Sequence, residues 1–181
     1  MRWEEIDQQI CSVARALAVV GDRWTLLVIR DAFLGIRRFE DFRRNLGISR
    51  HRLADRLGKL VANGVLLKVR YQDKPARYEY RLTPRGVDLY PVLLTLAQWG
   101  NQWCDDGNGP PVEYLHRSCG EKTHALLTCS ECGEPLLPQQ VTPVPGPGLE
   151  TALAEGGAGI NPAVVGEATG EAFLPPMLRR G

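Results

Sequence analysis

The feature that most limits the fold is a change in the spacing of apolar residues at Gly64. Before this glycine, apolar residues recur every three or four positions, which is the period of a helix with one buried face. After it, Leu67, Val69 and Tyr71 alternate with polar residues, as in a β-strand. A second alternating segment, residues 77–82, follows the turn-forming residues 72–76. The sequence therefore predicts a mainly α protein with one small β-hairpin, an α+β fold.

Apolar spacing and capping residues predict four helical segments ahead of the hairpin. Asp22 is suited to cap the second segment and Ser49 the fourth, because side-chain oxygens at these positions accept hydrogen bonds from unpaired helical N–H groups. The second segment is almost entirely apolar, so we expect it to be buried. The four segments are residues 10–20, 24–35, 37–47 and 50–63.

The fourth segment has two opposed faces. Leu53, Leu57, Leu60 and Val61 form a stripe that should face a core. The opposite side is basic, which is typical of the second helix of a helix-turn-helix. A basic hairpin directly after such a helix indicates a winged helix-turn-helix. The basic or polar residues of the helix are Ser49, Arg50, His51, Arg52, Arg56 and Lys59.

The charge is divided along the chain, although the net charge is only +1. Residues 1–104 hold 18 Lys and Arg against 11 Asp and Glu, a net +7, whereas residues 105–181 hold 4 against 10, a net −6. In the first part 15 of the 18 basic residues are Arg, whose guanidinium matches phosphate and guanine edges. This charge balance favours a polyanionic partner, double-stranded DNA.

A long helix is predicted from Thr83-Pro84 to about Cys104, with Pro91 causing a kink or a late start. Its apolar residues recur at spacings of three and four, which suits a seam between helices. We expect this seam to form a homodimer interface, which would place two recognition helices about one DNA turn apart. The seam residues are Leu89, Val92, Leu96, Trp99 and Trp103.

Two short pairs of potential metal ligands follow the long helix. His116 and Cys119 form one pair, Cys129 and Cys132 the other, and nine residues separate them. Four nitrogen or sulfur ligands at this spacing are typical of a structural zinc site. His124 could replace His116 as the fourth ligand. The alternatives are reduced thiols or a redox disulfide between Cys119 and Cys132, although disulfides seldom persist in a reducing cytoplasm.

The remaining cysteines and the tryptophans have less specific interpretations. Cys11 lies on an apolar helix face, where a cysteine is usually a small core residue; the alternative is a thiol sensor, with Arg15 one turn away lowering its pKa. Cys104 has no assigned role. Trp24, Trp99 and Trp103 could line a pocket for an effector, but packing is the simpler interpretation.

Composition divides the chain into three predicted parts. Residues 1–104 form the winged-helix and dimerisation domain, 105–140 the zinc module, and 141–181 a Pro-, Gly- and Ala-rich tail without sustained periodicity, except for a short helix near 149–155. We detect no internal repeat. No segment has the length of a membrane span or the order of a signal peptide, which predicts a cytoplasmic protein with no membrane partner. No catalytic constellation is evident, so we do not expect an enzyme.

Five motifs stand out along the chain: Cys11, Gly21 to Arg30, Arg37 to Phe39, Arg56 to Leu60 and Tyr80 to Gly86. Together they resemble the motifs of the HxlR family of bacterial winged-helix transcription regulators, relatives of the MarR group. The resemblance covers about residues 10–103 and implies a dimer on a short inverted repeat, more commonly a repressor than an activator. In some relatives the cysteine equivalent to Cys11 senses electrophiles or oxidants. The chain departs from the family at 50–52, where Arg-His-Arg follows Ser49.

The leading hypothesis is a homodimeric, sequence-specific DNA-binding transcription regulator with a zinc module. One alternative is a protein-interaction adaptor without specific DNA binding, and another is a redox sensor acting through Cys11. An unidentified small molecule or oxidant is a possible effector. The residues predicted to contact DNA are Arg37, Arg38, Ser49, Arg50, His51, Arg52, Arg56, Lys59, Arg70, Lys74 and Arg77.

Overall fold

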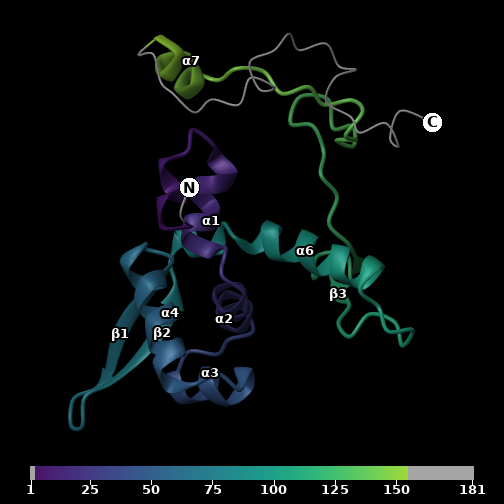
Figure 1. Ribbon diagram of the computed structural model, residues 1–181. Helices are drawn as coiled ribbons and strands as arrows, with labels where there is room; N and C mark the ends of the chain where they lie inside the picture. The colour runs from purple at the N-terminus through teal and green to yellow at the C-terminus, as the bar shows by residue number, and fades with distance from the viewer. Residues whose placement is uncertain (1–2, 155–181) are drawn as a thin grey trace. The chain divides into compact units, whose positions relative to one another are not determined.

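The computed structural model describes residues 3–154, which fall into two compact units. One unit contains residues 16–125 and the other residues 3–15 together with 126–154. The elements are mostly helical, with one hairpin of substantial length (Figure 1). In chain order they are η1 (Trp3–Gln8), α1 (Ser12–Val20), α2 (Arg23–Phe33), α3 (Phe39–Leu46), α4 (Arg50–Ala62), β1 (Leu66–Gln72), β2 (Arg77–Leu82), α5 (Pro84–Val87), α6 (Tyr90–Trp103), β3 (Tyr114–Leu115), β4 (Lys122–Thr123) and α7 (Pro147–Ala154).

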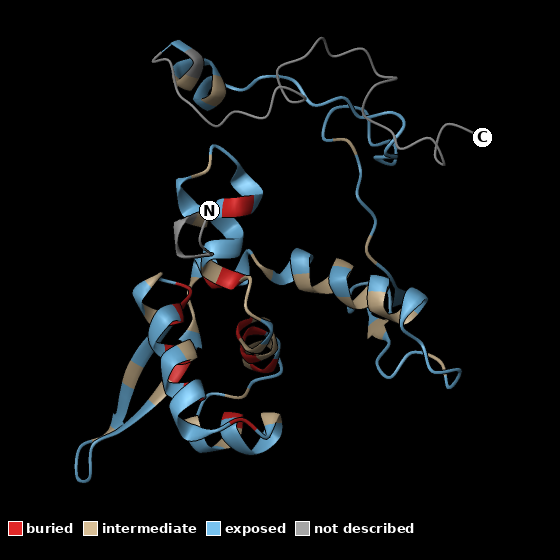
Figure 2. Ribbon diagram, in the orientation of Figure 1, coloured by how far each residue is buried: buried red, intermediate tan, exposed pale blue. Residues whose placement is uncertain are grey.

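The core of the larger unit lies between α2, α3, α4 and the start of β1, where Figure 2 shows the buried positions. The predicted helices and both predicted caps are confirmed. The Asp22 carboxylate accepts hydrogen bonds from the N–H groups of Trp24 (2.9 Å) and Thr25 (3.3 Å), and the Ser49 hydroxyl accepts one from Arg52 (3.4 Å). The core is formed by Val28, Ile29, Phe42, Leu53, Leu57, Leu60, Val65 and Leu66, with Val20, Ile48 and Tyr80 at its margin.

The β1–β2 hairpin is antiparallel and lies beside α4 (Figure 1). Leu67 and Tyr71, two of the alternating apolar residues of β1, are exposed. Leu66 is the buried residue of β1, and Leu67 is 57% exposed. The strand begins one residue earlier than the pattern suggested, since Val65 and Leu66 already pack against the core.

The predicted helix after the hairpin is divided into two. Thr83 caps the short α5, its hydroxyl accepting a hydrogen bond from Gly86 N–H (3.1 Å), with Pro84 as the first helical residue. The chain then turns at Asp88 and Leu89, and α6 begins at Tyr90. Pro91 lies at the start of α6, where its missing N–H costs nothing. This is the late start that Pro91 predicted.

The cysteine-containing segments and the tail are less regular. Strands β3 and β4 form a small antiparallel hairpin within residues 16–125. The short helix expected near 149–155 is present as α7, while residues 155–181 of the predicted tail lie outside the described residues. No helix in the described part of the chain has the length and apolar character needed to cross a membrane.

Candidate nucleic-acid interface

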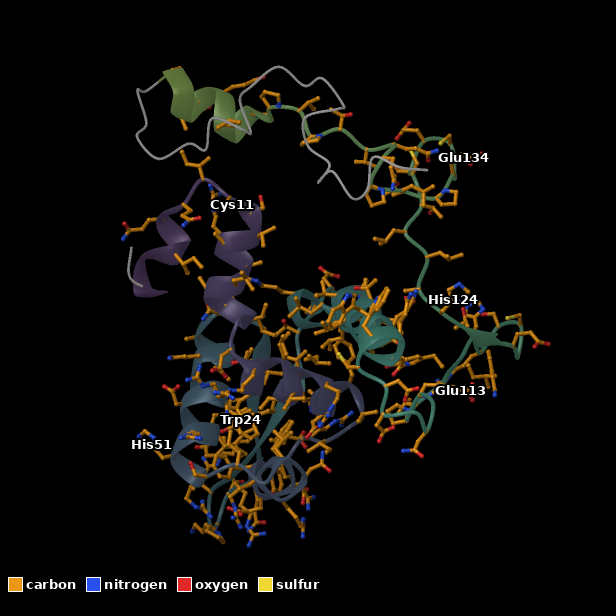
Figure 3. All side chains as sticks on the ribbon, turned by 45° about the vertical axis from the view of Figure 1, so that its right-hand side comes forward. Cys11, Trp24, His51, Glu113, His124 and Glu134 are labelled. Carbon is orange, nitrogen blue, oxygen red and sulfur yellow. The ribbon has the colours of Figure 1, made fainter. Side chains whose placement is uncertain are left out.

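Helix α4 presents one buried and one solvent-exposed face, as its sequence predicts. Leu53, Leu57 and Leu60 are completely buried. His51 and Arg52 are exposed at the start of the helix, and Figure 3 shows His51 projecting away from it. The leucines therefore fix the rotation of α4 about its axis, and this rotation leaves the first turn accessible to a ligand.

Arg50 is exposed but engaged by acidic and aromatic neighbours from α3. Its guanidinium forms an ion pair with Glu40 and lies 5.3 Å from the centre of the Phe39 ring. A hydrogen bond from Arg43 to Glu40 (2.8 Å), together with the charges of Arg50 and Arg43, lowers the pKa of the Glu40 carboxyl from its usual value. Glu40 is thus a carboxylate, and its ion pair holds the Arg50 guanidinium close to the start of α4.

Arg56 occupies a different environment from the other basic residues of α4. Its side chain is 24% exposed and forms ion pairs with Asp22 (3.5 Å) and Asp55 (3.2 Å). Lys59 also pairs with Asp55, at 3.4 Å, but is more exposed. Arg56 therefore links α4 to the capping residue of α2, a structural role that the sequence pattern did not reveal.

A buried carboxylate joins α2 to α3 behind this surface. Asp31 is fully buried and accepts hydrogen bonds from Arg30 (2.8 and 3.0 Å) and from the Asn45 side chain (2.8 Å). Gly47 ends α3 with φ of 61°, a left-handed conformation that suits glycine. These features fix the turn from which α4 begins. The roles of Asp31 and Asn45 were not predicted, because a lone polar residue in a helix gives no signal of its partner.

The hairpin contacts the segment that precedes α3, and its tip is basic. Tyr80 N–H donates a hydrogen bond to the Arg37 carbonyl (2.8 Å), and the Arg38 guanidinium lies 5.0 Å from the centre of the Tyr71 ring. Near the tip, Arg70 bonds the Asp73 carbonyl (2.9 Å) and pairs with its carboxylate (3.2 Å). Exposed Lys74 and Arg77 complete the tip.

Helix α6 has no buried residue in the single chain. Val92, Leu96, Trp99 and Trp103 are 50%, 47%, 57% and 67% exposed. Leu89, also predicted for the interface, precedes the helix and packs against the chain's own core. Helices of monomeric proteins seldom leave this many large apolar residues exposed.

The predicted metal ligands lie in two local pairs. His116 Nδ1 is 3.3 Å from Cys119 Sγ within the larger unit. Cys129 and Cys132 belong to the other unit, where hydrogen bonds from the backbone N–H groups of Cys132 and Glu131 lower the pKa of the Cys129 thiol. Within residues 3–154, no group of three or more potential ligands is gathered at one point.

The other two cysteines are also free. Cys11 is exposed rather than part of a core, and Arg15, its neighbour one turn away, donates a hydrogen bond from Nε to the Gln9 carbonyl (3.2 Å). Cys104 follows the last residue of α6 and is exposed.

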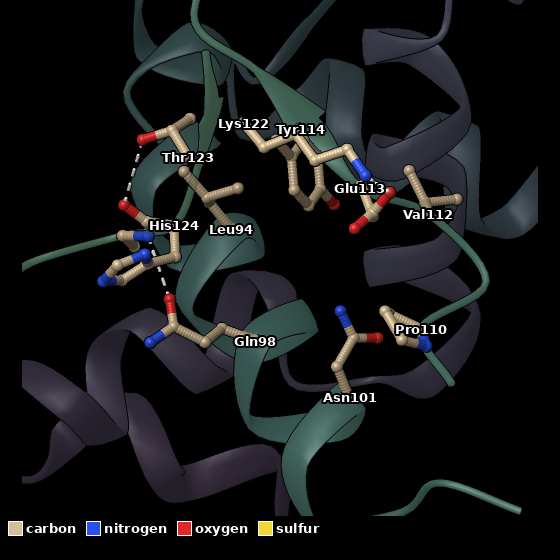
Figure 4. A pocket seen from close by; sticks show the side chains of 11 residues that line it. Leu94, Gln98, Asn101, Pro110, Val112, Glu113, Tyr114, Lys122, Thr123 and His124 are labelled. Atoms are coloured by element: carbon tan, nitrogen blue, oxygen red, sulfur yellow. Dashed lines mark hydrogen bonds and ion pairs between the residues drawn. The ribbon is translucent and has the colours of Figure 1, made fainter. Parts of the chain in front are cut away.

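A cavity of about 180 Å³ lies between α6 and the β3–β4 hairpin (Figure 4). Leu94, Gln98 and Asn101 line it from α6, and Tyr114 and His124 from the hairpin segment. The Gln98 side chain accepts a hydrogen bond from Ala125 N–H (2.9 Å), which connects the segment after β4 to the helix. None of the three tryptophans considered for an effector pocket lines this cavity.

Related proteins support the helix-turn-helix arrangement of α3 and α4. The family description "HxlR-like helix-turn-helix" matches residues 19–108. An uncharacterised HTH-type transcriptional regulator of Mycobacterium tuberculosis is 48% identical over 143 residues, 79% of this chain and 90% of the relative. A regulator of the same type from Synechocystis is 33% identical over 53% of this chain and 72% of the relative.

Solved structures extend this similarity to three dimensions. The crystal structure of PA1607, described as a candidate transcription factor, has a TM-score of 0.66 at 36% identity and covers 72% of this chain and 92% of that chain. The redox regulator HypR in its reduced form has a TM-score of 0.50 at 31% identity and covers 52% of this chain and 95% of that chain.

Proposed function

Because the chain belongs to the HxlR-like helix-turn-helix family of transcriptional regulators, we propose that it acts as a homodimer that reads a specific inverted repeat in double-stranded DNA. The observation that carries the proposal is the exposed basic first turn of α4, held in place by completely buried leucines on the opposite face. An α-helix fits the DNA major groove, and its first residues reach the base edges.

The role proposed for each residue of α4 follows from its exposure and from its ion-pair partners. Arg50, His51 and Arg52 lie in the first turn of α4 and are assigned to base edges or adjacent phosphates. Arg56 and Lys59 are assigned to phosphates, and Arg56 must exchange its ion pairs with Asp22 and Asp55 to reach one. Ser49 caps the helix and orients its N-terminus toward DNA.

The hairpin supplies the second set of contacts. Lys74 and Arg77 at its exposed tip are assigned to phosphates or the minor groove, and Arg70 orders the tip through Asp73. Arg37 and Arg38 precede α3 and contact the strands of the hairpin, so they lie where a backbone contact would connect the two elements.

We propose that the dimer forms through α6. A helix with four large apolar residues about half exposed gains free energy when an identical helix covers them. Two-fold symmetry would repeat α4 at a fixed spacing, which an inverted repeat in DNA matches.

We propose repression as the outcome, because a dimer seated on a promoter obstructs polymerase. A reporter gene under the chain's own upstream region should rise in activity when the regulator is deleted.

The test of DNA reading uses Arg50→Ala together with Arg52→Ala. The double variant should lose specific binding in an electrophoretic mobility assay while retaining the far-UV circular dichroism of the wild type. Arg85→Ala is the matched control, because Arg85 is an exposed arginine of α5 outside α4 and the hairpin. Full retention of affinity by the double variant would contradict the proposal and favour a protein-interaction adaptor.

A second candidate function, thiol sensing through Cys11, is favoured by the exposure of that residue. The structural similarity to a redox regulator adds support. An exposed thiol is accessible to oxidants, and its modification next to α1 would then alter DNA affinity. A Cys11→Ser variant that releases DNA normally on treatment with hydrogen peroxide would exclude this function.

A further inference from the structure

Helix α6 presents two opposite faces, because successive residues of a helix are rotated by about 100°. The residues proposed for the dimer lie on one face: Val92, Leu96, Trp99 and Trp103. The α6 residues that line the cavity beside the β3–β4 hairpin lie on the other face: Leu94, Gln98 and Asn101. A second copy that covers the first face therefore does not need to cover the cavity. The helix and the hairpin belong to the same compact unit, residues 16–125.

The walls of the cavity are largely apolar. Leu94 contributes from α6, and Pro110, Val112 and Ala125 contribute from the segments before and after the hairpin strands. The cavity volume is about 180 Å³. For comparison, a dry apolar cavity of about 150 Å³ can hold one benzene molecule. The cavity beside α6 thus has room for a single six-membered ring with one small substituent.

Two polar side chains face this cavity with unused hydrogen-bonding capacity. Figure 4 shows the Asn101 carboxamide on the α6 side and the Tyr114 hydroxyl on the hairpin side, both directed into the cavity. Neither side chain forms a hydrogen bond with another residue within 3–154. The neighbouring Gln98 differs, because its Oε1 already accepts a hydrogen bond from Ala125 N–H (2.9 Å). Asn101 and Tyr114 are therefore the groups left to bind a ligand.

The charged residues at the cavity offset each other. Lys122 Nζ lies 2.6 Å from Glu113 Oε2, in an ion pair between the residue before β3 and the first residue of β4. Among the described residues that line the cavity, no other is Lys, Arg, Asp or Glu. An ionic ligand would lose hydration here without gaining an unpaired opposite charge, which costs free energy. The lining thus favours an uncharged ligand.

We propose that this cavity binds a small, uncharged aromatic amide. A primary carboxamide carries a donor and an acceptor side by side, so it can pair with the Asn101 carboxamide through two hydrogen bonds. An alcohol of the same size would form only one hydrogen bond at a time with either atom of that group. The aromatic ring gains free energy by leaving water for the apolar walls. The site involves neither α4 nor the β1–β2 hairpin, so binding can be measured without DNA.

The experiment is an NMR titration of the ¹⁵N-labelled full-length protein with benzamide. We expect saturable binding with a dissociation constant of about 1 mM or lower, which is within reach of a ligand of this size. The amide shifts should be largest for residues 94–101 and 110–125, which contain the lining residues. Benzoate, which adds a charge to the same shape, and acetamide, which lacks the ring, should each bind at least about tenfold more weakly.

Variants then separate the cavity from the rest of the surface. Asn101→Leu removes the hydrogen bonds at nearly constant size and should weaken benzamide binding about tenfold or more. Val112→Trp places a large ring at an exposed position of the wall and should block the cavity. Gln102→Ala is the matched control, because Gln102 is an exposed residue of α6 that does not line the cavity. It should bind benzamide as the wild type does.

Three results would overturn the proposal. The first is a wild type that shows no saturable binding of benzamide at millimolar concentrations, or shifts that lie mainly outside the two segments. The second is benzoate binding as tightly as benzamide. The third is equal affinity of the wild type and a folded Asn101→Leu variant. Each readout is independent of DNA binding.

Discussion

Replacing Trp99 with alanine should strongly weaken the proposed homodimer, because this residue presents a large exposed apolar surface on α6. A Trp side chain can bury up to about 250 Å², so the 57% exposed fraction of Trp99 leaves about 140 Å² for a partner. At about 25 cal/mol per Å², complete coverage would contribute about 3.5 kcal/mol per copy, and half coverage about 1.8 kcal/mol. Two copies at half coverage give about 3.5 kcal/mol, which raises the dimer dissociation constant about 300-fold.

Sedimentation velocity over a range of protein concentrations measures this constant. The matched control is Leu67→Ala, because Leu67 is also 57% exposed but lies on β1, away from the proposed interface. The control should dimerise as the wild type does. Equal dissociation constants for Trp99→Ala and wild type would refute the assignment of α6 to the dimer, and so would a wild type that remains monomeric at the highest concentrations.

Three single substitutions test packing and charge in the larger unit. Gly86→Ala should destabilise the fold by about 1–3 kcal/mol in urea unfolding, because the new Cβ would stand 2.3 Å from the Val65 carbonyl oxygen. Gly58→Ala should instead stabilise it by up to about 1 kcal/mol, since nothing lies within 4 Å and alanine favours the helix; a loss of stability would contradict this. Glu40→Gln should tighten DNA binding severalfold in low salt by releasing Arg50 from its ion pair and removing a negative charge; unchanged affinity would show that Arg50 does not face the DNA.

The repeating apolar pattern was sufficient to predict the helices, the hairpin and the rotation of α4. Leucines at i, i+4 and i+7 determine which face is buried, whatever the neighbours are. The two caps, Asp22 and Ser49, were predictable for a similar reason, because an N-cap acts on N–H groups only two or three residues away.

Features that depend on distant partners were not predictable. The ion pairs of Arg56 with Asp22 and of Arg50 with Glu40 join residues from different helices, so sequence spacing gives no signal of them. The exposure of Leu67 could not be predicted either, because the alternation in β1 does not say which face of the strand is buried.

No internal repeat was detected in the sequence, yet the turns at residues 116–121 and 129–134 are two copies of one backbone arrangement, a duplication that was missed for a different reason. Its two copies share Cys, Gly and Glu at equivalent positions, but the residues that differ obscure the similarity in the sequence. The backbone hydrogen bonds are the same in both, since they require only a glycine at the left-handed position and no particular side chain elsewhere.

Specific reading of DNA is tested by fluorescence anisotropy of the full-length protein with its own upstream DNA and with a scrambled duplex of equal length and composition, each titrated with salt. We expect tight binding to the upstream fragment, far weaker binding to the scrambled one, and a steep fall in affinity with salt as phosphate contacts from two subunits release counterions. Equal, weak binding of both duplexes across the salt range, with Arg50→Ala/Arg52→Ala binding no more weakly than the wild type, would contradict it.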